Sequence, residues 1–132
     1  MTRVVVPVRY PLTEHSRRTL SEAIRVADER EASLTVLHVN LYQRGRDVSR
    51  TQLKRAVESA VGRIPRSRYV VREGFLVEET ILEEVAADEA DVVVIGHKQV
   101  GRWRRMFRKL TADPDIESFL REKLDAEVVT VG

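Results

Sequence analysis

The feature that most constrains the fold is a run of aliphatic residues, Val92–Ile95, that leads directly into Gly96. A continuous aliphatic run of this length, rich in valine, is typical of a strand buried on both faces of a parallel sheet. A glycine at the end of such a strand indicates a turn at the crevice where open parallel sheets bind ligands. We therefore expect Gly96–Gly101 to be a loop that forms part of any binding site.

Four other segments share the preference for strand structure, and helical patterns separate them. The predicted strands are Arg3–Val8, Ser33–Val39, Arg68–Arg72, Asp91–Ile95 and Glu127–Val131. Apolar residues at helical spacing predict helices after Thr13, after Ser49, over Glu78–Ala87, over Val100–Leu110 and after Asp113–Pro114. Thr13 is a helix-capping residue, and Ser49 with Gln52 matches a capping box. The length of 132 residues suits a single domain over residues 1–132.

Alternation of strands and helices predicts an α/β fold with an open five-stranded parallel sheet and helices on both faces. Five strands fit the order 3-2-1-4-5, which is Rossmann-like. In that order the topological switch point lies between the first and fourth strands. The segments Val8–His15 and Gly96–Gly101 should therefore wall the crevice.

Composition narrows the class of protein. No apolar run approaches the roughly 20 residues that a membrane-spanning helix needs. Cysteine is absent, which excludes disulfides and thiol chemistry. The N-terminus enters a strand at once, so we expect no secretory leader and a cytoplasmic protein.

The charges are segregated along the chain. Residues 98–109 hold six basic side chains and no acidic one, so the remaining residues carry a net charge of −4 within a total of +2. The six are Lys98, Arg102, Arg104, Arg105, Arg108 and Lys109. Interleaved with Trp103 and Phe107, they match a surface for nucleic acid or an acidic partner. Alternatively, the apolar residues dock on the sheet or on a second copy, and the arginines stay solvated.

Side chains for catalysis or metal binding do not occur in a recognisable pattern. His15, His38 and His97 have no short-spaced partner ligand, and no nucleophile, base and acid are arranged together. We therefore predict neither an enzyme nor a metal site. Arg9, His97 and Lys98 should meet at the crevice, where they could hold a phosphate or a carboxylate. Alternatively, Arg9 pairs with Asp113 or Asp115 and fills the crevice itself.

Several segments together resemble one family. These are Val4–Val8, Thr13–Leu20, Leu34–Val39, Val71–Gly74, Ala90–Gly96 and Ala126–Val131. In order and spacing they are similar to the universal stress proteins, whose fold is adenine nucleotide alpha hydrolase-like. The resemblance implies a homodimer formed through the last strand, Glu127–Val131. One branch of the family binds ATP, with an aspartate after the first strand and the motif G-x2-G-x9-G-(S/T).

Gly96 matches the first glycine of that motif, but the chain departs from the ATP-binding pattern elsewhere. Arg9 stands where the aspartate belongs, and Gln99 replaces the second glycine, although Gly101 is close by. The closing glycine and hydroxyl residue become Pro114 and Asp115. We therefore predict a degenerate nucleotide pocket and no cofactor.

The main functional prediction is a homodimeric regulatory or scaffold domain of the stress response, with an unknown protein partner. Two alternatives remain open. One is binding of ATP, AMP or another anion by Arg9, Gly96, His97, Lys98 and Gly101. The other is binding of nucleic acid or an acidic partner through Arg102–Lys109.

Overall fold

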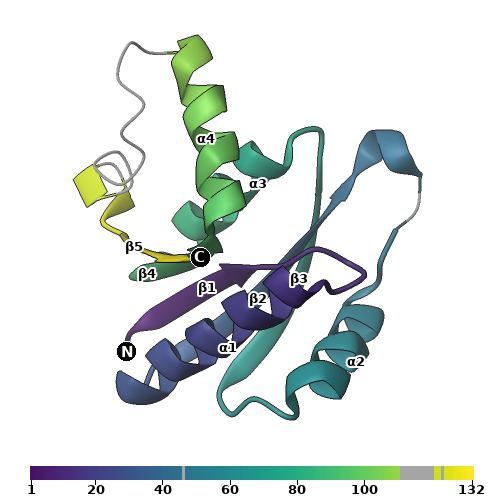
Figure 1. Cartoon of the computed structure of the whole chain (residues 1–132), viewed down its shortest axis with the longest axis vertical. Helices are drawn as coiled ribbons and strands as arrows, with labels where there is room; N and C mark the ends of the chain where they lie inside the picture. Colours follow the sequence, from purple (N-terminus) through teal and green to yellow (C-terminus); the bar gives the residue numbers. More distant parts are fainter. Residues whose placement is uncertain (46, 111–120, 123) are drawn as a thin grey trace.

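The computed structural model describes the chain apart from residues 46, 111–120 and 123 and the side chains of residues 107–110 (Figure 1). The strands are β1 (Arg3–Pro7), β2 (Ser33–Leu41), β3 (Ser67–Gly74), β4 (Val92–Gly96) and β5 (Glu127–Val131). The helices are α1 (Glu14–Glu29), the short 3-10 helix η1 (Tyr42–Arg44), α2 (Arg50–Val61), α3 (Val77–Ala87) and α4 (His97–Leu110). The strands form one parallel sheet in the order β3-β2-β1-β4-β5, which confirms the predicted topology.

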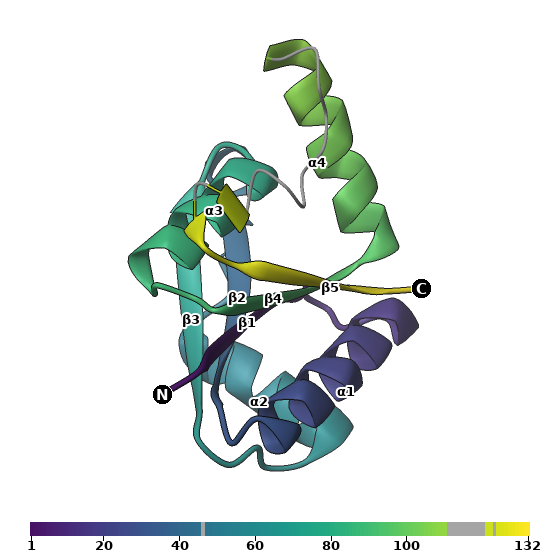
Figure 2. The ribbon, with the colours of Figure 1, turned by 90° about the vertical axis from the view of Figure 1, so that its left-hand side faces the viewer.

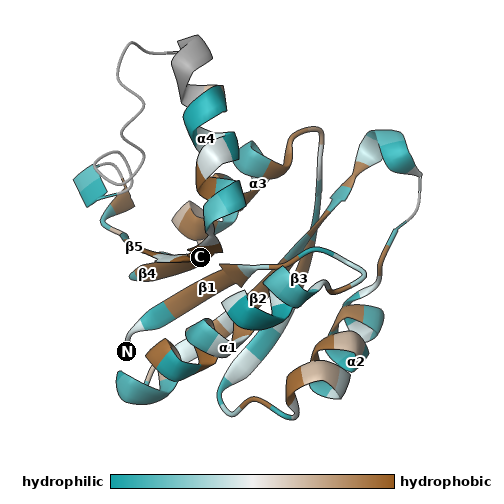
Figure 3. Ribbon diagram, in the orientation of Figure 1, coloured by the Kyte–Doolittle hydropathy of each residue, from teal (hydrophilic) through white to brown (hydrophobic). Residues whose placement is uncertain are grey.

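The sheet lies between two layers of helices, with α1 and α2 on one face and α3 and α4 on the other (Figure 2). Successive residues of β1 serve opposite faces: Val4 and Val6 join the core under α1 and α2, and Val5 joins the core under α3 and α4. Both cores are apolar, and the polar residues lie on the outer sides of the helices (Figure 3). Each buried valine contributes about 1.5–3 kcal/mol through loss of apolar surface from water. Two covered faces explain the uninterrupted aliphatic runs.

The helix caps and the end of β1 lie at or next to the positions that the sequence predicts. The Thr13 side chain accepts a hydrogen bond from the Ser16 amide at 3.2 Å and caps α1. The Ser49 and Gln52 side chains form the reciprocal capping box at the start of α2. Pro7 is the last residue of β1, where its missing amide hydrogen costs one ladder bond at most. These details were predictable because each one uses residues close in sequence.

The predicted loop Gly96–Gly101 is wrong. Gly96 is the last residue of β4, α4 begins at the next residue, and Gly101 lies inside that helix. A helix forms here instead of a loop because packing α4 on the sheet buries Val100 and Trp103 in the core with Ile81 of α3. The indole nitrogen of Trp103 also donates a hydrogen bond to the Glu78 carbonyl oxygen at 3.1 Å.

Other strand boundaries also differ from the predicted ones. β2 runs on to Leu41 and β3 covers Ser67–Gly74, because the two strands stay paired from Leu34 opposite Ser67 to Leu41 opposite Gly74. The helix predicted to start at Asp113–Pro114 lies outside the described residues. Among the described residues, no helix combines the length and the apolar character that crossing a bilayer requires.

Gly101→Ala should stabilise the protein by about 0.5–1 kcal/mol, because alanine is favoured over glycine inside a helix. A β-carbon at this position would meet no atom within 4 Å. The free energy of unfolding in urea measures the effect. A loss of stability would show that Gly101 needs a backbone conformation unlike that of α4.

Gly74→Ala is the matched control, with the opposite expected sign. A β-carbon at Gly74 would lie 2.1 Å from Thr80 Oγ1. Thr80 is 3% exposed, and its hydroxyl already donates to the Leu76 carbonyl at 2.7 Å. Because Thr80 cannot easily move, we expect a loss of about 1–3 kcal/mol.

Candidate functional site

The switch point of the sheet lies between β1 and β4, where their chains turn to opposite faces. β1 continues into a loop that reaches α1 at Glu14, and β4 continues directly into α4. His38 of β2 holds this loop in place, because its Nδ1 donates to the Val8 carbonyl oxygen at 3.1 Å. The Tyr10 ring packs edge-on against the His38 ring at 6.2 Å. His38 is thus structural, as its isolation in the sequence suggested, and the loop carries Arg9 to the crevice.

The first turn of α1 faces the first turn of α4 across the crevice. The His15 and His97 rings lie 6.1 Å apart, edge to face. An Arg18 nitrogen lies 2.9 Å from His15 Nδ1, which accepts the hydrogen bond in the neutral imidazole. The charge of Lys98 lowers the pKa of His15 most, followed by desolvation and the charges of Arg18 and His97. Four cationic or titratable groups therefore gather at this point.

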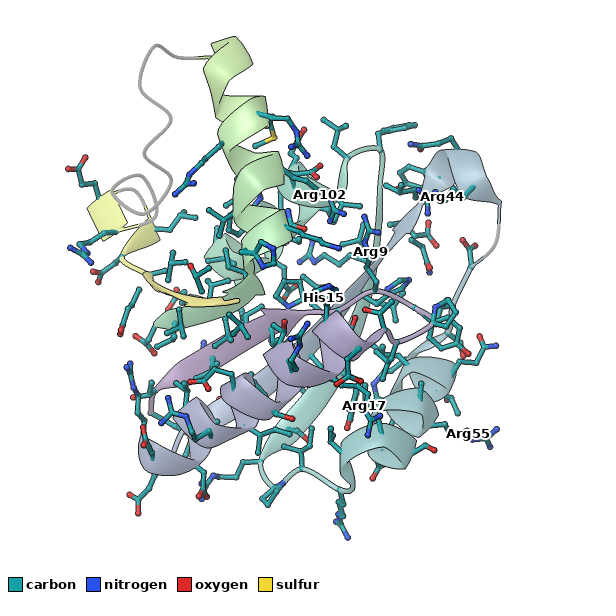
Figure 4. All side chains as sticks on the ribbon, viewed as in Figure 1. Arg9, His15, Arg17, Arg44, Arg55 and Arg102 are labelled. Atoms are coloured by element: carbon teal, nitrogen blue, oxygen red, sulfur yellow. The ribbon has the colours of Figure 1, made fainter. Side chains whose placement is uncertain are left out.

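Arg102 extends the cluster along α4. Burial lowers the pKa of the Arg102 guanidinium, and the charge of Arg9 lowers it further, whereas Glu78 acts in the opposite direction. Figure 4 shows Arg9, Arg102 and His15 along the same opening between the start of α1 and α4. Arg102 was predicted for an outward basic surface, but it is half-buried beside Arg9.

The predicted crevice residues divide into two groups. Arg9, His97 and Lys98 do lie around the opening, whereas Gly101 belongs to the α4 helix. Gly96 ends β4, and a β-carbon there would lie 3.6 Å from Thr19 Oγ1, an ordinary contact. Gly96 therefore has room for a side chain, and its predicted role in ligand binding stays a prediction.

The crevice is positively charged. In the part of the chain that the structure describes, Arg9, Lys98 and Arg102 are in no ion pair. The predicted partners of Arg9, Asp113 and Asp115, lie outside the described residues. An excess of cations beside two imidazoles is suited to an anion, since Arg and Lys donate hydrogen bonds and accept none.

The predicted basic surface Arg102–Lys109 needs one correction. Trp103 has no exposed surface and packs in the core, so it cannot stack on a base. Arg104 and Arg105 are exposed on the outer side of α4. The side chains of Phe107, Arg108 and Lys109 lie outside the described residues. The predicted alternative, in which the apolar residues dock on the sheet, holds for Val100 and Trp103.

Two members of the crevice were not singled out from the sequence. In the sequence, His15 stands out only as a possible metal ligand and as the end of the segment Val8–His15, and Arg18 does not stand out. The Thr13 cap is the signal that could have found them, because it starts α1 one residue before His15 and turns Arg18 to the same side three residues later.

The described residues contain no cluster of three or more His, Asp or Glu side chains that could hold a metal. Apart from Arg18, the groups near His15 that shift its pKa are Lys98, His97 and the exposed carboxylate of Glu14. The arrangement can bind and orient a negatively charged group.

Lys98→Gln should raise the pKa of His15 towards its ordinary value of 6.5, because the Lys98 charge is the largest cause of its depression. An NMR titration of the imidazole resonances measures this. The pKa of His15 is lower in the folded than in the unfolded chain. Protonation of His15 therefore destabilises the folded state as the pH falls below the ordinary value of 6.5. Lys54→Gln on α2 is the control; an equal change there would contradict the proximity of Lys98.

Comparison with known proteins gives a consistent picture. The model of the universal stress protein family matches residues 1–113. A universal stress protein from Archaeoglobus fulgidus has a similar structure, with a TM-score of 0.64 at 18% identity over 100% of this chain and 99% of that one. Among curated protein sequences, none matches this chain.

Two further similar structures contain nucleotides. One is the Archaeoglobus fulgidus protein in complex with dAMP, with a TM-score of 0.63 at 17% identity over 100% of this chain and 98% of that one. The other is a universal stress protein in complex with cAMP, with a TM-score of 0.57 at 17% identity over 97% and 96% of the two chains.

Proposed function

Because the chain belongs to the universal stress protein family, we propose that it is a regulatory domain of the stress response that acts through contacts with a protein partner. In this proposal it catalyses no reaction and uses no ATP cofactor. The family's nucleotide pocket is replaced by the cationic crevice.

The observation that carries the proposal is the pair formed by Arg9 and Arg102 at the crevice. In the ATP-binding branch that the sequence resembles, an aspartate at the position of Arg9 accepts a hydrogen bond from the adenine amine. A guanidinium has donors only, so it cannot replace that acceptor. In the described residues, α4 also starts directly after Gly96, so no loop follows this glycine that could surround a triphosphate.

ATP should therefore leave the melting temperature unchanged at concentrations that saturate ATP-binding relatives. A ligand at 100 times its Kd would stabilise the folded state by about 2.7 kcal/mol, which is easily measured in a thermal shift assay. Inorganic phosphate is the control for a general anion effect. A clear shift with ATP that Arg9→Ala abolishes would overturn the proposal.

A second candidate function is binding of a nucleoside monophosphate in a different pose. The convergence of Arg9, His15, Lys98 and Arg102 on one opening favours it, as do the similar structures that contain cAMP and dAMP. The phosphate of the nucleotide would supply the negative charge that balances the cations of the crevice. In this pose the base would not need a hydrogen-bond acceptor at the position of Arg9. AMP or cAMP would then raise the pKa of His15, which distinguishes this function from the first.

The proposal includes a homodimer through β5. This strand pairs with β4 on one side and is the last strand of the sheet. Val129 and Val131 are only half-buried against the core, and an aliphatic edge strand is a template for pairing with another chain. A second copy of the chain paired at this edge would cover both Val129 and Val131.

Sedimentation analysis should therefore give the mass of a dimer. Thr130→Lys places a charge on the exposed part of β5 and should shift the protein to monomer, because edge lysines oppose strand pairing. Thr51→Lys, at an exposed position of α2, is the matched control and should stay dimeric. A dimer that survives Thr130→Lys would contradict this interface.

Binding of nucleic acid through Arg102–Lys109 stays a prediction with less support, because Arg104 and Arg105 are the only exposed charged residues among the described side chains of this segment. The cytoplasm stays the predicted location.

A further inference from the structure

A second cationic site lies at the opposite edge of the sheet from the crevice. A cavity of about 220 Å³ opens between α2 and the connection that leads into β3. Since β3 begins at Ser67, this is the edge at which the strands start, and Figure 1 shows the connection below the sheet, away from α4. The cavity therefore shares no residue with the crevice.

The walls of this cavity carry an excess of positive charge. Arg50, Lys54, Arg63 and Arg66 line it, and Glu58 is the acidic residue among its lining residues. Within the described part of the chain, none of the four cations forms an ion pair.

Some of the other arginines do pair: Arg25, Arg30, Arg68 and Arg72 are each paired with a carboxylate. The feature that sets the four cations of the cavity apart is that they share one hollow. Four unpaired cations around one hollow repel one another, and an anion between them would remove that repulsion.

The backbone positions these cations on two sides. Arg50, Lys54 and Glu58 are spaced four residues apart on α2 and share a face of the helix. Arg50 is oriented by its Nε, which donates to the Tyr69 carbonyl oxygen at 3.1 Å, and its terminal nitrogens remain available. Arg66 adopts the left-handed conformation with φ of 52°, and its carbonyl accepts from the Leu34 amide at 3.0 Å. The opposing wall is thus held by the sheet.

Tyr69 supplies an independent indication of a ligand. The residue is 5% exposed and lines the cavity, and its buried hydroxyl makes no hydrogen bond of ordinary geometry with a described residue. Burial raises the pKa of this hydroxyl and the charge of Glu58 raises it further, whereas interaction with the Ser67 side chain lowers it, so the hydroxyl lies on the same side as Glu58 and Ser67. The Ser67 hydroxyl nearby donates instead to the Ile64 carbonyl at 2.6 Å. A buried polar group without a partner is rare in native proteins.

We propose that the α2–β3 cavity binds a small phosphorylated molecule. The guanidinium groups and Lys54 bind the phosphate oxygens, since arginine forks match phosphate geometry. Tyr69 donates to the ligand, and Glu58 accepts a hydrogen bond from a ligand hydroxyl. The volume is below the roughly 300–1,000 Å³ of pockets for drug-sized ligands, which favours a compound smaller than a nucleotide. The proposal does not rest on the function assigned to the crevice.

Isothermal titration of the full chain with pyrophosphate and with glycerol phosphate tests the proposal. We expect binding of both, and an affinity about tenfold or more weaker in the double variant Lys54→Gln, Arg63→Gln, because two charged contacts are lost. Arg55→Gln is the matched control: Arg55 is on the same helix but projects outward, as Figure 4 shows. Arg44→Gln, at an exposed position of η1 outside both the cavity and the crevice, is the second control. Both control variants should bind as the unaltered chain does.

Tyr69→Phe separates a binding role from a structural one. The hydroxyl makes no hydrogen bond of ordinary geometry with a described residue, so this variant should fold with an undiminished melting temperature. It should bind glycerol phosphate about threefold to tenfold more weakly, the usual range for one hydrogen bond.

Three results would overturn the proposal. One is that neither pyrophosphate nor glycerol phosphate binds at millimolar concentration. Another is an equal loss of affinity in Arg55→Gln or Arg44→Gln. The third is binding of duplex DNA through Lys54 and Arg63 while the small phosphates do not bind, which would assign the surface to a nucleic-acid backbone instead.

Discussion

The structure depends on the burial of β1 and β4 on both faces. These strands lie side by side in the middle of the sheet, and Val4, Val5, Val93 and Val94 have no exposed surface. A strand covered on both sides requires a helix layer above and below it, and right-handed crossovers supply these layers. The reversal of the chain between β1 and β4 then places two strand ends next to each other. The crevice follows from this arrangement and not from any local motif.

The side chains at the crevice give it a chemistry unlike that of an acidic adenine pocket. The charge of Arg9 lowers the pKa of Arg102, and the charges of Lys98 and Arg18 lower the pKa of His15 and favour its neutral form. Like charges in one region repel one another and destabilise the compact state. The α2–β3 cavity repeats this pattern of uncompensated charge at the other edge, so the sheet carries two separate basic openings.

The fold could be predicted because its signals are local or periodic. The caps at Thr13 and Ser49 use partners three residues away, and the strand order follows from alternation of elements. The site was only partly predictable. The sequence predicts a loop at Gly96–Gly101 because a glycine in a binding loop and a glycine inside a helix look alike in sequence. The burial of Val100 and Trp103 against α3 decides between them, and that contact spans residues far apart in the chain. The second cavity was missed for the same reason: the spacing of Arg50 and Lys54 on α2 is that of an ordinary solvated helix face, and only the fold brings Arg63 and Arg66 next to them.

Trp103 has a consequence for the geometry of α4. Successive residues of a helix are separated by about 100° around its axis, so neighbours of a fixed side chain have fixed directions. Trp103 is buried under α3, and its indole nitrogen donates a hydrogen bond to the Glu78 carbonyl oxygen. These contacts fix the orientation of α4 about its axis. Arg102 is thereby turned towards Arg9, and Arg104 is turned to solvent. The buried indole thus fixes the rotation of α4 about its own axis. If the helix were rotated by the angle between two successive residues, a different arginine would face inward.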